Sequence, residues 1–496
     1  MRKFKCFLLL LCCIISINVK SQGLSNIWLS GYASWGGLPF GGTVLDFKTG
    51  SINVNYKYIP MNFSTGVATI SDSLGNIKLY TNGIWVAGAN DDTIVNGGGI
   101  SPPVVQDSLG LWVGQCSMFL QKPNDSNIYF LIHSSVDNPN NYNFTNYVWY
   151  SVIDMNLNNG FGGIISKNNI LFNGQIMLGA INACKHGNGR DWWITAVERY
   201  TNKFFCAILT PYGIINLPKI SVPSFHNQSG SGNAFSRDGT KYAGVFLGDS
   251  IHKFNIHLYD FDRCNGILSN ERNIESIDSV GYARGIAFSP NGQYLYVATV
   301  YKVFQYDLSQ VNIKNSEIIV AEWDSFYSPS PPFATLYEWM SLAPDGKIYI
   351  NTGNSTLHMH IIDQPDSPGT ACNFIQHGLQ LPTKSVSAPP NHPNYFLGAN
   401  GLCNNLSYES LESWKVKKVT VFGNPTHDKF TLWFPVDKDV GWLEIYDVNG
   451  ECIRTERVAQ WSQYKTVDIS ELSAGVYFCK MRWPSGEGSV KVVRLE

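Results

Sequence analysis

Charged residues are scarce in this chain of 496 residues. Asp, Glu, Lys and Arg make up 15% of the sequence, against about 25% in an average globular protein. The formal net charge is only -2 and no basic stripe occurs, so the charge pattern gives no support for binding to nucleic acid or to an anionic membrane. Aromatic residues reach 13%, and the polar positions are rich in Asn, Gly, Ser and Tyr, which favours strands and turns over helices.

Several catalytic and metal-binding motifs are also absent. The sequence has no G-x-S-x-G nucleophile elbow, no P-loop, no Rossmann fingerprint and no C-x-x-C pair. No histidine lies at zinc-ligand spacing from a pair of cysteines. We therefore predict no cofactor, metal or particular catalytic residue, and an enzyme is the less favoured class.

Three short patterns bear on metal binding. The stretch "DMNLNNG" (154–160) resembles the start of a calcium loop, but its Gly comes one position late and Ile165 stands where the bidentate Glu belongs. His252 and His257 are five residues apart, so strand alternation places them on opposite faces. The "HMH" stretch (358–360) puts two histidines on one face, for which a surface or channel pair is the simpler interpretation.

The N-terminus has the pattern of a secretory signal peptide. Basic residues precede a short apolar run (6–17), and the small residues of "VKS" (19–21) predict cleavage before Gln22. A lipoprotein signal is the alternative, because Cys12 and Cys13 follow leucines, but it would leave an apolar run of only about six residues. No other stretch is apolar enough to span a bilayer, so no transmembrane segment is predicted.

One unit recurs along the chain. It is clearest in "AFSRDGTKYAGVFLG" (234–248), "AFSPNGQYLYVATV" (287–300) and "SLAPDGKIYINTG" (341–353). Each copy begins with a small or apolar residue, continues through an Asp-Gly or Asn-Gly sequence that fits a two-residue hairpin turn, and ends in an alternating, half-buried strand. Weaker copies begin at positions 68, 118 and 185, and the period of about 50 residues is close to that of propeller blades.

The repeats predict a β-propeller over residues 22–405, with seven blades and with six or eight as alternatives. Six blades come from the visible repeats. The seventh should combine both ends of the propeller, with "GGTVLDFKTG" (41–50) pairing with strands near "NYFLGANG" (394–401). Radial packing of the blades would bury both faces of each sheet and leave only short edges.

The composition changes after Cys403. A polar, charged stretch (406–418) is interpreted as a linker. Residues 419–496 then contain short strands at regular spacing with turn signals between them, which predicts a small β-sandwich. The fold class is therefore all-β, with a propeller followed by a sandwich.

The C-terminal part also contains a recognisable set of short motifs. They are Asn424-Pro425 after an extended start, Gly450 in "EIYDVNGECI", Gly475 and Tyr477 in "VDISELSAGVYFCKM", and Lys491 in the final strand. In their order and spacing these residues resemble the type A sorting domain of the type IX secretion system. Gly423 and Arg494 depart from the family, which usually has Pro and a nearby Lys. The resemblance implies export to the periplasm, passage through an outer-membrane translocon, and usually removal of the domain by a surface protease.

Stretches in the N-terminal part include "HGNGRDWW" (186–193), "YDFDRCNGILSN" (259–270) and "PPNHPNYFLG" (389–398). Through them this part is similar to uncharacterised propeller-like proteins that often have such tails. That resemblance implies a fold and a location, either secreted or at the outer cell surface, and it implies no activity.

The stretch "KHGNGRDWWITAV" (185–197) contains a histidine, an arginine, a carboxylate and two tryptophans close together in the sequence. As the corner of a blade, Asn188-Gly189 would form a two-residue turn, Arg190 and Asp191 would tie the turn to a neighbouring blade, and the two tryptophans would face opposite sides. As a rim site it would bind a carboxylate or a sugar, with these candidate residues: His186, Arg190, Asp191 and Trp192. The blade corner is the favoured interpretation.

Two classes of function remain open. The favoured class is a secreted or surface-held propeller that binds a protein or a glycan without chemistry. The alternative is an extracellular carbohydrate-active hydrolase or lyase with its site at the propeller mouth. Two carboxylates about 5–9.5 Å apart at the mouth would favour a glycosidase, whereas a mouth lined by Asn, Ser and Tyr would favour binding.

Eight cysteines of the eleven lie outside the signal segment, an even number that permits disulfides in an oxidising compartment. We expect one bridge between Cys372 and Cys403, which flank the closing segment of the propeller. We expect another between Cys452 and Cys479, which lie on strands of one small domain.

Overall fold

The structure is a computed structural model that describes residues 23–101, 110–134, 136–137, 144–177, 179–226, 230–248, 250, 252–278, 282–400, 403 and 419–496. The predicted signal peptide (1–21) and linker (406–418) lie outside the described residues. The chain divides into two compact units, Met1–Gly401 and Leu402–Glu496.

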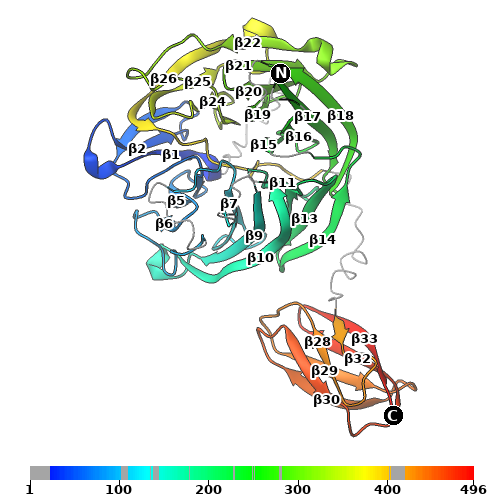
Figure 1. Cartoon of the computed structure of the whole chain (residues 1–496). Coiled ribbons are helices and arrows are strands. Elements are labelled where there is room, and N and C mark those ends of the chain that lie inside the picture. The colour runs from blue at the N-terminus through cyan, green and yellow to red at the C-terminus, as the bar shows by residue number, and fades with distance from the viewer. Residues whose placement is uncertain are drawn as a thin grey trace, which may run out of the picture. The chain divides into compact units, whose positions relative to one another are not determined.

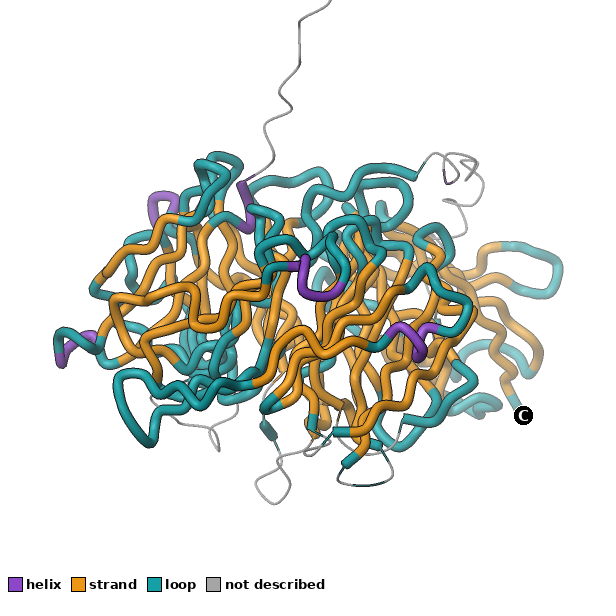
Figure 2. Tube along the Cα trace, turned by 90° about the horizontal axis from the view of Figure 1, so that it is seen from above, coloured by secondary structure: helices purple, strands orange, loops and turns teal. Residues whose placement is uncertain are grey.

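Strands dominate both units (Figure 2). Helices of the described residues are short 3-10 turns, none of them long and apolar enough to cross a membrane: Gly23–Ser25, Ser34–Gly36, Asn158–Gly160, Ile313–Ser316 and Gly369–Cys372.

The described part of the first unit contains seven antiparallel sheets, arranged radially as the blades of a propeller (Figure 1). Blades 1 and 2 have three strands each: β1 (Ile27–Tyr32), β2 (Gly41–Asp46), β3 (Asn53–Lys57); β4 (Ala68–Ser71), β5 (Ile77–Thr81), β6 (Val86–Gly88). Blades 3 and 4 have four: β7 (Ser117–Gln121), β8 (Ile128–Ser134), β9 (Phe144–Asp154), β10 (Gly163–Met177); β11 (Asn182–Lys185), β12 (Trp192–Val197), β13 (Lys203–Thr210), β14 (Gly213–Ser221).

Blades 5 to 7 are also four-stranded. Their strands are β15 (Gly230–Phe235), β16 (Lys241–Leu247), β17 (Lys253–Asp262), β18 (Ile267–Ile277); β19 (Ala283–Phe288), β20 (Tyr294–Thr299), β21 (Lys302–Asp307), β22 (Ile318–Glu322); β23 (Met340–Leu342), β24 (Ile348–Ile350), β25 (Thr356–Ile362), β26 (Phe374–Ser385). In Figure 1, β7, β11, β15 and β19 lie near the centre, and β10, β14, β18 and β22 lie at the rim. The predicted all-β fold with a seven-bladed propeller is confirmed.

Apolar side chains between neighbouring blades form the core of the propeller. Trp28 and Leu45 of blade 1 pack on Tyr349 of blade 7, and Ala243 and Phe254 of blade 5 share a cluster with Phe304 of blade 6. The second strand of a blade is therefore covered on both faces, and every residue of β12 and β20 is buried. The prediction of a half-buried second strand is wrong, because each blade packs between two others.

The turns between the first two strands of a blade are longer than predicted. In the turn at 236–241 the Ser236 N–H donates to the Lys241 carbonyl and the Gly239 N–H donates to the Ser236 carbonyl. Gly239 has φ 71°, so the glycine supplies the positive φ expected of it, but as the third residue of a four-residue loop. The predicted two-residue turns are wrong, because the closing pair of the hairpin lies one residue further out on each side.

The ring closes without the predicted mixed blade. Strand β2 pairs with β1 and β3, all from the N-terminal end, and residues 394–400 form no strand. The channel segment, defined as residues 386–400, instead runs through the centre of the propeller. Its Tyr395 hydroxyl donates to the Phe119 carbonyl of blade 3 at 2.7 Å, and its Asn391 amide donates to the Ile181 carbonyl before blade 4 at 3.1 Å. The pairing prediction was wrong because these side-chain contacts, and not a strand ladder, hold the segment.

The second unit is a small β-sandwich. One sheet has the order β27 (Thr420–Phe422), β28 (Lys429–Trp433), β31 (Tyr464–Asp468), and the other the order β30 (Cys452–Val458), β29 (Gly441–Tyr446), β32 (Gly475–Trp483), β33 (Gly486–Arg494). Buried residues from both sheets, including Leu432, Ile445, Val467 and Met481, form one hydrophobic cluster.

The predicted motif residues of this unit occupy structurally defined positions. The Asn424 side chain accepts from the Val493 N–H at 2.8 Å and donates to the Lys491 carbonyl at 3.0 Å, which joins the segment around Pro425 to the last strand. The Tyr477 hydroxyl donates to the Ser473 carbonyl at 2.7 Å, as in the tyrosine corners of β-sandwiches. Gly450 has φ 83° in the turn between β29 and β30, and Gly475 begins β32.

Both predicted disulfides are wrong. Cys372, Cys452 and Cys479 are free thiols, and the disulfide-bonded cysteines among the described residues are Cys264 and Cys403. Strands β30 and β32 lie on either side of β29, so Cys452 and Cys479 are two strand spacings apart. That is about 9–10 Å, beyond the span of a disulfide.

Candidate functional site

The stretch predicted as a candidate site forms a closed turn at the start of blade 4. Asp191 is buried and accepts two hydrogen bonds from the half-exposed Arg190, from Nε at 2.8 Å and from Nη2 at 2.9 Å. The Asn188 amide donates to the same carboxylate at 2.8 Å. The cation and the carboxylate of this turn therefore satisfy each other, and the predicted tie from Arg190 and Asp191 to a neighbouring blade is wrong.

The aromatic residues of the same stretch are buried on opposite sides of β12, as predicted. Trp192 packs edge-on against Tyr395 of the channel segment, with ring centroids 5.7 Å apart. Trp193 faces blade 5, and its Nε1 donates to the Arg263 carbonyl at 2.7 Å. The His186 ring lies 5.2 Å from the Trp193 ring. Both tryptophans are at most 3% exposed, so neither presents a face to a ligand.

Arg263, directly after β17, adds polar contacts between blades 4 and 5 to the packing of Trp193. Its guanidinium donates to the carbonyls of Lys185, His186 and Gly398. These bonds join the turn of blade 4, the third strand of blade 5 and the channel segment.

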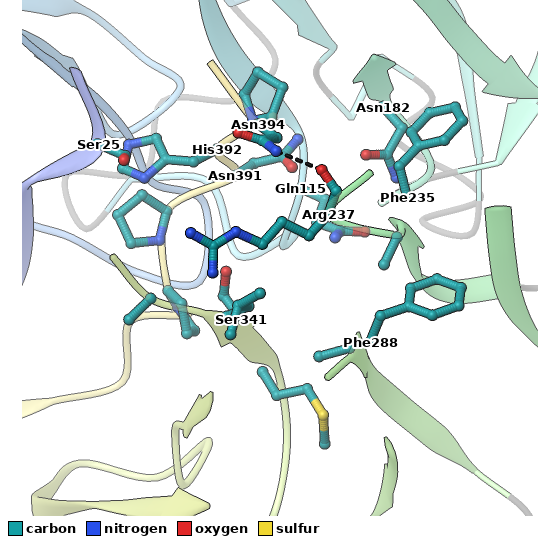
Figure 3. A pocket seen from close by; sticks show the side chains of 18 of the residues that line it. Ser25, Gln115, Asn182, Phe235, Arg237, Phe288, Ser341, Asn391, His392 and Asn394 are labelled. Atoms are coloured by element: carbon teal, nitrogen blue, oxygen red, sulfur yellow. Dashed lines mark hydrogen bonds between the residues drawn. The ribbon is translucent and has the colours of Figure 1, made fainter. Parts of the chain in front are cut away.

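A cavity of about 190 Å³ lies beside the channel segment at the centre of the propeller (Figure 3). It is lined by the innermost strands β11, β15, β19 and β23, by Trp28 of β1 and by residues 389–397 of the channel segment. Because the innermost strands of different blades meet only here, the cavity combines side chains that are far apart in the sequence.

The cavity has both polar and apolar lining residues and one permanent charge among the described residues. Amide and hydroxyl side chains line it, namely Ser25, Gln115, Asn182, Asn233, Ser236, Ser341, Asn391 and Asn394. Trp28, Phe235, Phe288, Trp339 and Phe396 supply aromatic surface. No Asp, Glu or Lys is among the described residues that line the cavity, and Arg237 is the one arginine.

Arg237 lies in the turn after β15, and its side chain extends across the pocket (Figure 3). It is exposed, and its guanidinium has no hydrogen bond or ion pair to a described residue. The adjacent Asp238 is engaged within the turn, where it accepts from the Ser236 hydroxyl at 2.6 Å and from the Thr240 N–H at 3.0 Å. These bonds lower the pKa of Asp238 despite its partial burial, so the carboxylate is ionised without pairing with Arg237.

Asn394 fixes the rim around this arginine. Its amide nitrogen donates to the Arg237 carbonyl at 2.5 Å, and its amide oxygen accepts from the Phe396 N–H at 3.0 Å. Phe396 is 39% exposed and also lines the cavity. One side chain of the channel segment thus hydrogen-bonds the backbones of Arg237 and Phe396, two residues that line the same cavity.

Several buried nitrogens of the lining residues have no hydrogen-bond partner among the described residues. They are Trp28 Nε1, Trp339 Nε1, Asn182 Nδ2 and His392 Nδ1. The His392 Nε2–H donates to the Thr69 carbonyl at 2.8 Å, which leaves Nδ1 as an acceptor in the neutral ring. Since buried polar atoms are normally paired, these atoms indicate a water or ligand position in or beside the cavity.

Two titratable groups that line the cavity, His392 and Cys184, have pKa values far from neutral pH. Burial lowers the pKa of His392 to about 4, and burial raises the pKa of the Cys184 thiol to about 12. Ser341 has no histidine or carboxylate among the residues that share the cavity, other than His392, whose Nε2 is already used. A general base or an activated nucleophile is therefore not assembled by the described lining.

The other sequence patterns lie away from this cavity. Asp154 accepts from the Asn156 N–H at 2.8 Å, which closes an ordinary turn. His252 is exposed whereas His257 is buried and bonds Glu271 at 2.8 Å, so they share no site.

The two histidines of the "HMH" stretch bond separate groups. His358 pairs with the Ser328 hydroxyl, whereas His360 pairs with the Leu336 carbonyl. No group of three potential metal ligands occurs in the described part of the chain.

Sequence reasoning missed Arg237, although the repeat contained a signal. The turn reads "SRDG" at 236–239, whereas the corresponding turns read "SPNG" at 289–292 and "APDG" at 343–346. Arg237 thus stands where the other two clear copies have Pro290 and Pro344. The position faces the central axis, which only the assembled ring reveals.

Comparison with protein families identifies the second unit. Residues 420–494 match the model described as the secretion system C-terminal sorting domain. The second unit is a type IX sorting domain. The match confirms the predicted resemblance and indicates export by the type IX system to the cell surface or the extracellular space.

Comparison with solved structures returns propeller-like neighbours at low similarity. One is from Bacteroides fragilis, and its assignment as a 6-phosphogluconolactonase is provisional; it has 11% identity and a TM-score of 0.44, and the match covers 74% of this chain and 98% of that chain. A protein of unknown function from Desulfotomaculum acetoxidans has 12% identity and a TM-score of 0.40, with coverage of 74% and 100%. Comparison with curated proteins gives no match.

Proposed function

We propose that this protein is an exported binding module whose propeller takes a small polar ligand, part of a glycan or of a protein, in the axial cavity. The observation that supports the proposal is the lining, which is rich in Asn, Ser and aromatic side chains and has no carboxylate among its described residues. Such a lining can hydrogen-bond and stack on a ligand but cannot supply acid–base chemistry.

The alternative, a carbohydrate-active hydrolase or lyase, has less support. A glycosidase needs two carboxylates about 5–9.5 Å apart on either side of the scissile bond. The one charged residue of the described lining is the cation Arg237, and no carboxylate is among the described residues beside it.

The sorting domain and the predicted signal peptide indicate which secretion components the chain interacts with. The sorting domain implies interaction with the type IX translocon. We propose that a signal peptide first directs the chain to the periplasm, and that a surface protease removes the sorting domain, which leaves the propeller secreted or at the outer cell surface.

The binding proposal is tested by filling the cavity. Ser341 is half-buried and lines the pocket (Figure 3), so Ser341→Phe should block it. Full-length wild type and variant are compared on a glycan array and a peptide library. Ser309→Phe, at an exposed turn of blade 6, is the control for added bulk. We expect ligands that bind wild type and Ser309→Phe but not Ser341→Phe; equal binding by all three would contradict an axial site.

Export is tested separately. Deleting residues 413–496 should leave the propeller in the periplasm, because the translocon no longer finds its sorting domain. Cell fractionation of the native host with full-length and truncated chains measures this. Equal amounts of both chains in the medium would contradict the role of the second unit.

A further inference from the structure

We propose that the ligand of the axial cavity is a saccharide with a carboxylate, and that Arg237 binds this carboxylate. The inference rests on the proposed binding function and narrows it to one chemical class. It depends on three features of the site: a cation without a partner among the described residues, an exposed aromatic ring that lines the same cavity, and a small interior with hydrogen-bonding atoms that have no partner there.

The first feature is the charge. An arginine normally pairs with a carboxylate where one is within reach, as Arg190 does with Asp191. Arg237 is next to Asp238 in the sequence, but that carboxylate is held by Ser236 and Thr240. No acidic residue is among the described residues lining the cavity, so the guanidinium can offer its parallel N–H groups to an incoming carboxylate.

A carboxylate fits this site better than a phosphate. Phosphate sites in proteins usually combine several cations or a concave array of backbone N–H groups, because the ligand has up to two charges. The described lining provides one permanent cation. A single planar guanidinium matches the single charge and the two oxygens of a carboxylate.

The second feature is the rim. Phe396 presents an exposed ring, and Asn394 hydrogen-bonds the backbones of both Phe396 and Arg237. A pyranose ring has an apolar C–H face and a polar edge of hydroxyl groups. Its C–H face can pack on Phe396 while a carboxylate on the ring reaches Arg237, so the rim suits an acidic sugar better than a peptide terminus.

The third feature is the interior. Asn182 Nδ2 and the indole N–H groups of Trp28 and Trp339 are donors without partners among the described residues, and sugar hydroxyl oxygens are acceptors for such groups. The cavity volume of about 190 Å³ is below the range of about 300–1,000 Å³ typical for drug-sized ligands. We therefore expect the cavity to admit one terminal sugar residue of a longer glycan.

The test uses calorimetric titration of the full chain with short oligosaccharides that end in galacturonate, glucuronate or N-acetylneuraminate. Each is compared with its methyl ester, which keeps the sugar and removes the charge. We expect at least one acid to bind, and its ester to bind about 10- to 100-fold more weakly, the usual loss for a charge-assisted hydrogen bond. Arg237→Gln should cause a similar loss for the acid and little change for the ester.

Two further variants make the result specific. Phe396→Ala should weaken both acid and ester, because the ring contacts the sugar and not its charge. Lys203→Gln removes an exposed cation at the start of β13, outside the cavity, and should bind as wild type does. Melting curves of all variants should overlap, since neither Arg237 nor Phe396 is buried.

The outcomes separate the two proposals. If the ester binds as tightly as the acid, or if Arg237→Gln has no effect, the carboxylate inference is wrong while a neutral glycan site remains. If peptides with a free C-terminus bind and the acidic sugars do not, the saccharide class is wrong. If Ser341→Phe leaves every observed binding unchanged, the axial site itself is wrong.

Discussion

Two turns in neighbouring blades share a backbone hydrogen-bond pattern, but their arginines differ in whether they pair with a carboxylate. In the turn at 186–191 of blade 4 and the turn at 236–241 of blade 5, the fourth residue donates to the first carbonyl at 2.8 Å. Arg190 is locked onto Asp191, which is nearly buried. Arg237 has an acidic neighbour too, but Asp238 bonds its own turn and leaves the guanidinium free over the axial cavity.

The difference shows that a cluster of charged and aromatic residues in the sequence need not form a ligand-binding site. The blade 4 turn and the start of β12 contain a histidine, an arginine, a carboxylate and two tryptophans, yet these side chains contact one another, the neighbouring blades and the channel segment. The blade 5 turn has fewer such side chains, and its Arg237 guanidinium has no hydrogen-bond partner among the described residues. Unsatisfied groups at a cavity, and not the number of polar residues, point to a ligand.

The largest effect is expected from the buried side of the blade 4 turn. Trp193→Ala should lower the free energy of unfolding by about 3–5 kcal/mol, because it opens a cavity between blades 4 and 5 and leaves the Arg263 carbonyl without its donor. Urea denaturation followed by tryptophan fluorescence measures the loss. Trp35→Ala is the control, since that ring is 83% exposed and should change stability by less than about 0.5 kcal/mol. Similar stabilities for the two variants would contradict a structural role for the turn.

Acid should destabilise the propeller through the channel segment. The pKa of His392 is about 4 in the folded chain and 6.5 in the unfolded chain, so between these pH values the unfolded chain binds the proton and the folded chain does not. Stability is therefore full above pH 6.5 and is lost as the pH falls toward 4, by about 3 kcal/mol for this one group.

The measurement is urea denaturation at pH 7.5 and at pH 4.5 for wild type and His392→Gln. His133, His226 and His360 also have pKa values lowered by burial and contribute in both proteins, so the comparison isolates His392. The variant should lose less stability on acidification than wild type does. An identical loss in both would show that His392 titrates normally in the fold.

A smaller effect is expected where the blade 4 turn contacts the channel segment. A Cβ on Gly189 would lie 2.5 Å from the Ala399 backbone nitrogen, whereas one on Gly292 in the corresponding turn of blade 6 meets nothing within 4 Å. Both glycines have φ near 72°, so an alanine at either position has the same left-handed backbone strain, and this strain cancels in the comparison. Gly189→Ala should cost about 1–3 kcal/mol more than Gly292→Ala in the free energy of unfolding. Equal costs would mean that the segment moves freely away from the turn.

Much of the fold is predictable from the sequence, for identifiable reasons. Local patterns such as "SPNGQYLYV" predict a turn and a strand, and the six visible copies account for six of the seven blades. The ring closure is not predictable in this way, because residues 389–398 have three prolines and are held by side-chain bonds to several blades. The disulfide bonding of Cys264 was missed, because spacing along the chain does not report distance in space.

The candidate site was less predictable than the fold. Its lining comes from five blades and the channel segment, so no contiguous stretch contains it. The pairing of Arg190 with Asp191 and the isolation of Arg237 depend on side-chain directions within turns that share a backbone hydrogen-bond pattern. The one local signal is that position 237 has Arg where the two other clear copies of the repeat have Pro. This difference points to a site only once the turn is known to lie at the axis.

The most direct test of the axial site measures melting and ligand affinity on two matched variants, Arg190→Gln and Arg237→Gln. Arg190→Gln should lower the melting temperature, because Asp191 is then left nearly buried without its cation, and it should bind an acidic oligosaccharide as tightly as wild type does. Arg237→Gln should melt as wild type does and bind the same ligand about 10- to 100-fold more weakly. The reverse pattern, with binding lost only in Arg190→Gln and its melting unchanged, would place the site at the blade 4 turn and contradict an axial site.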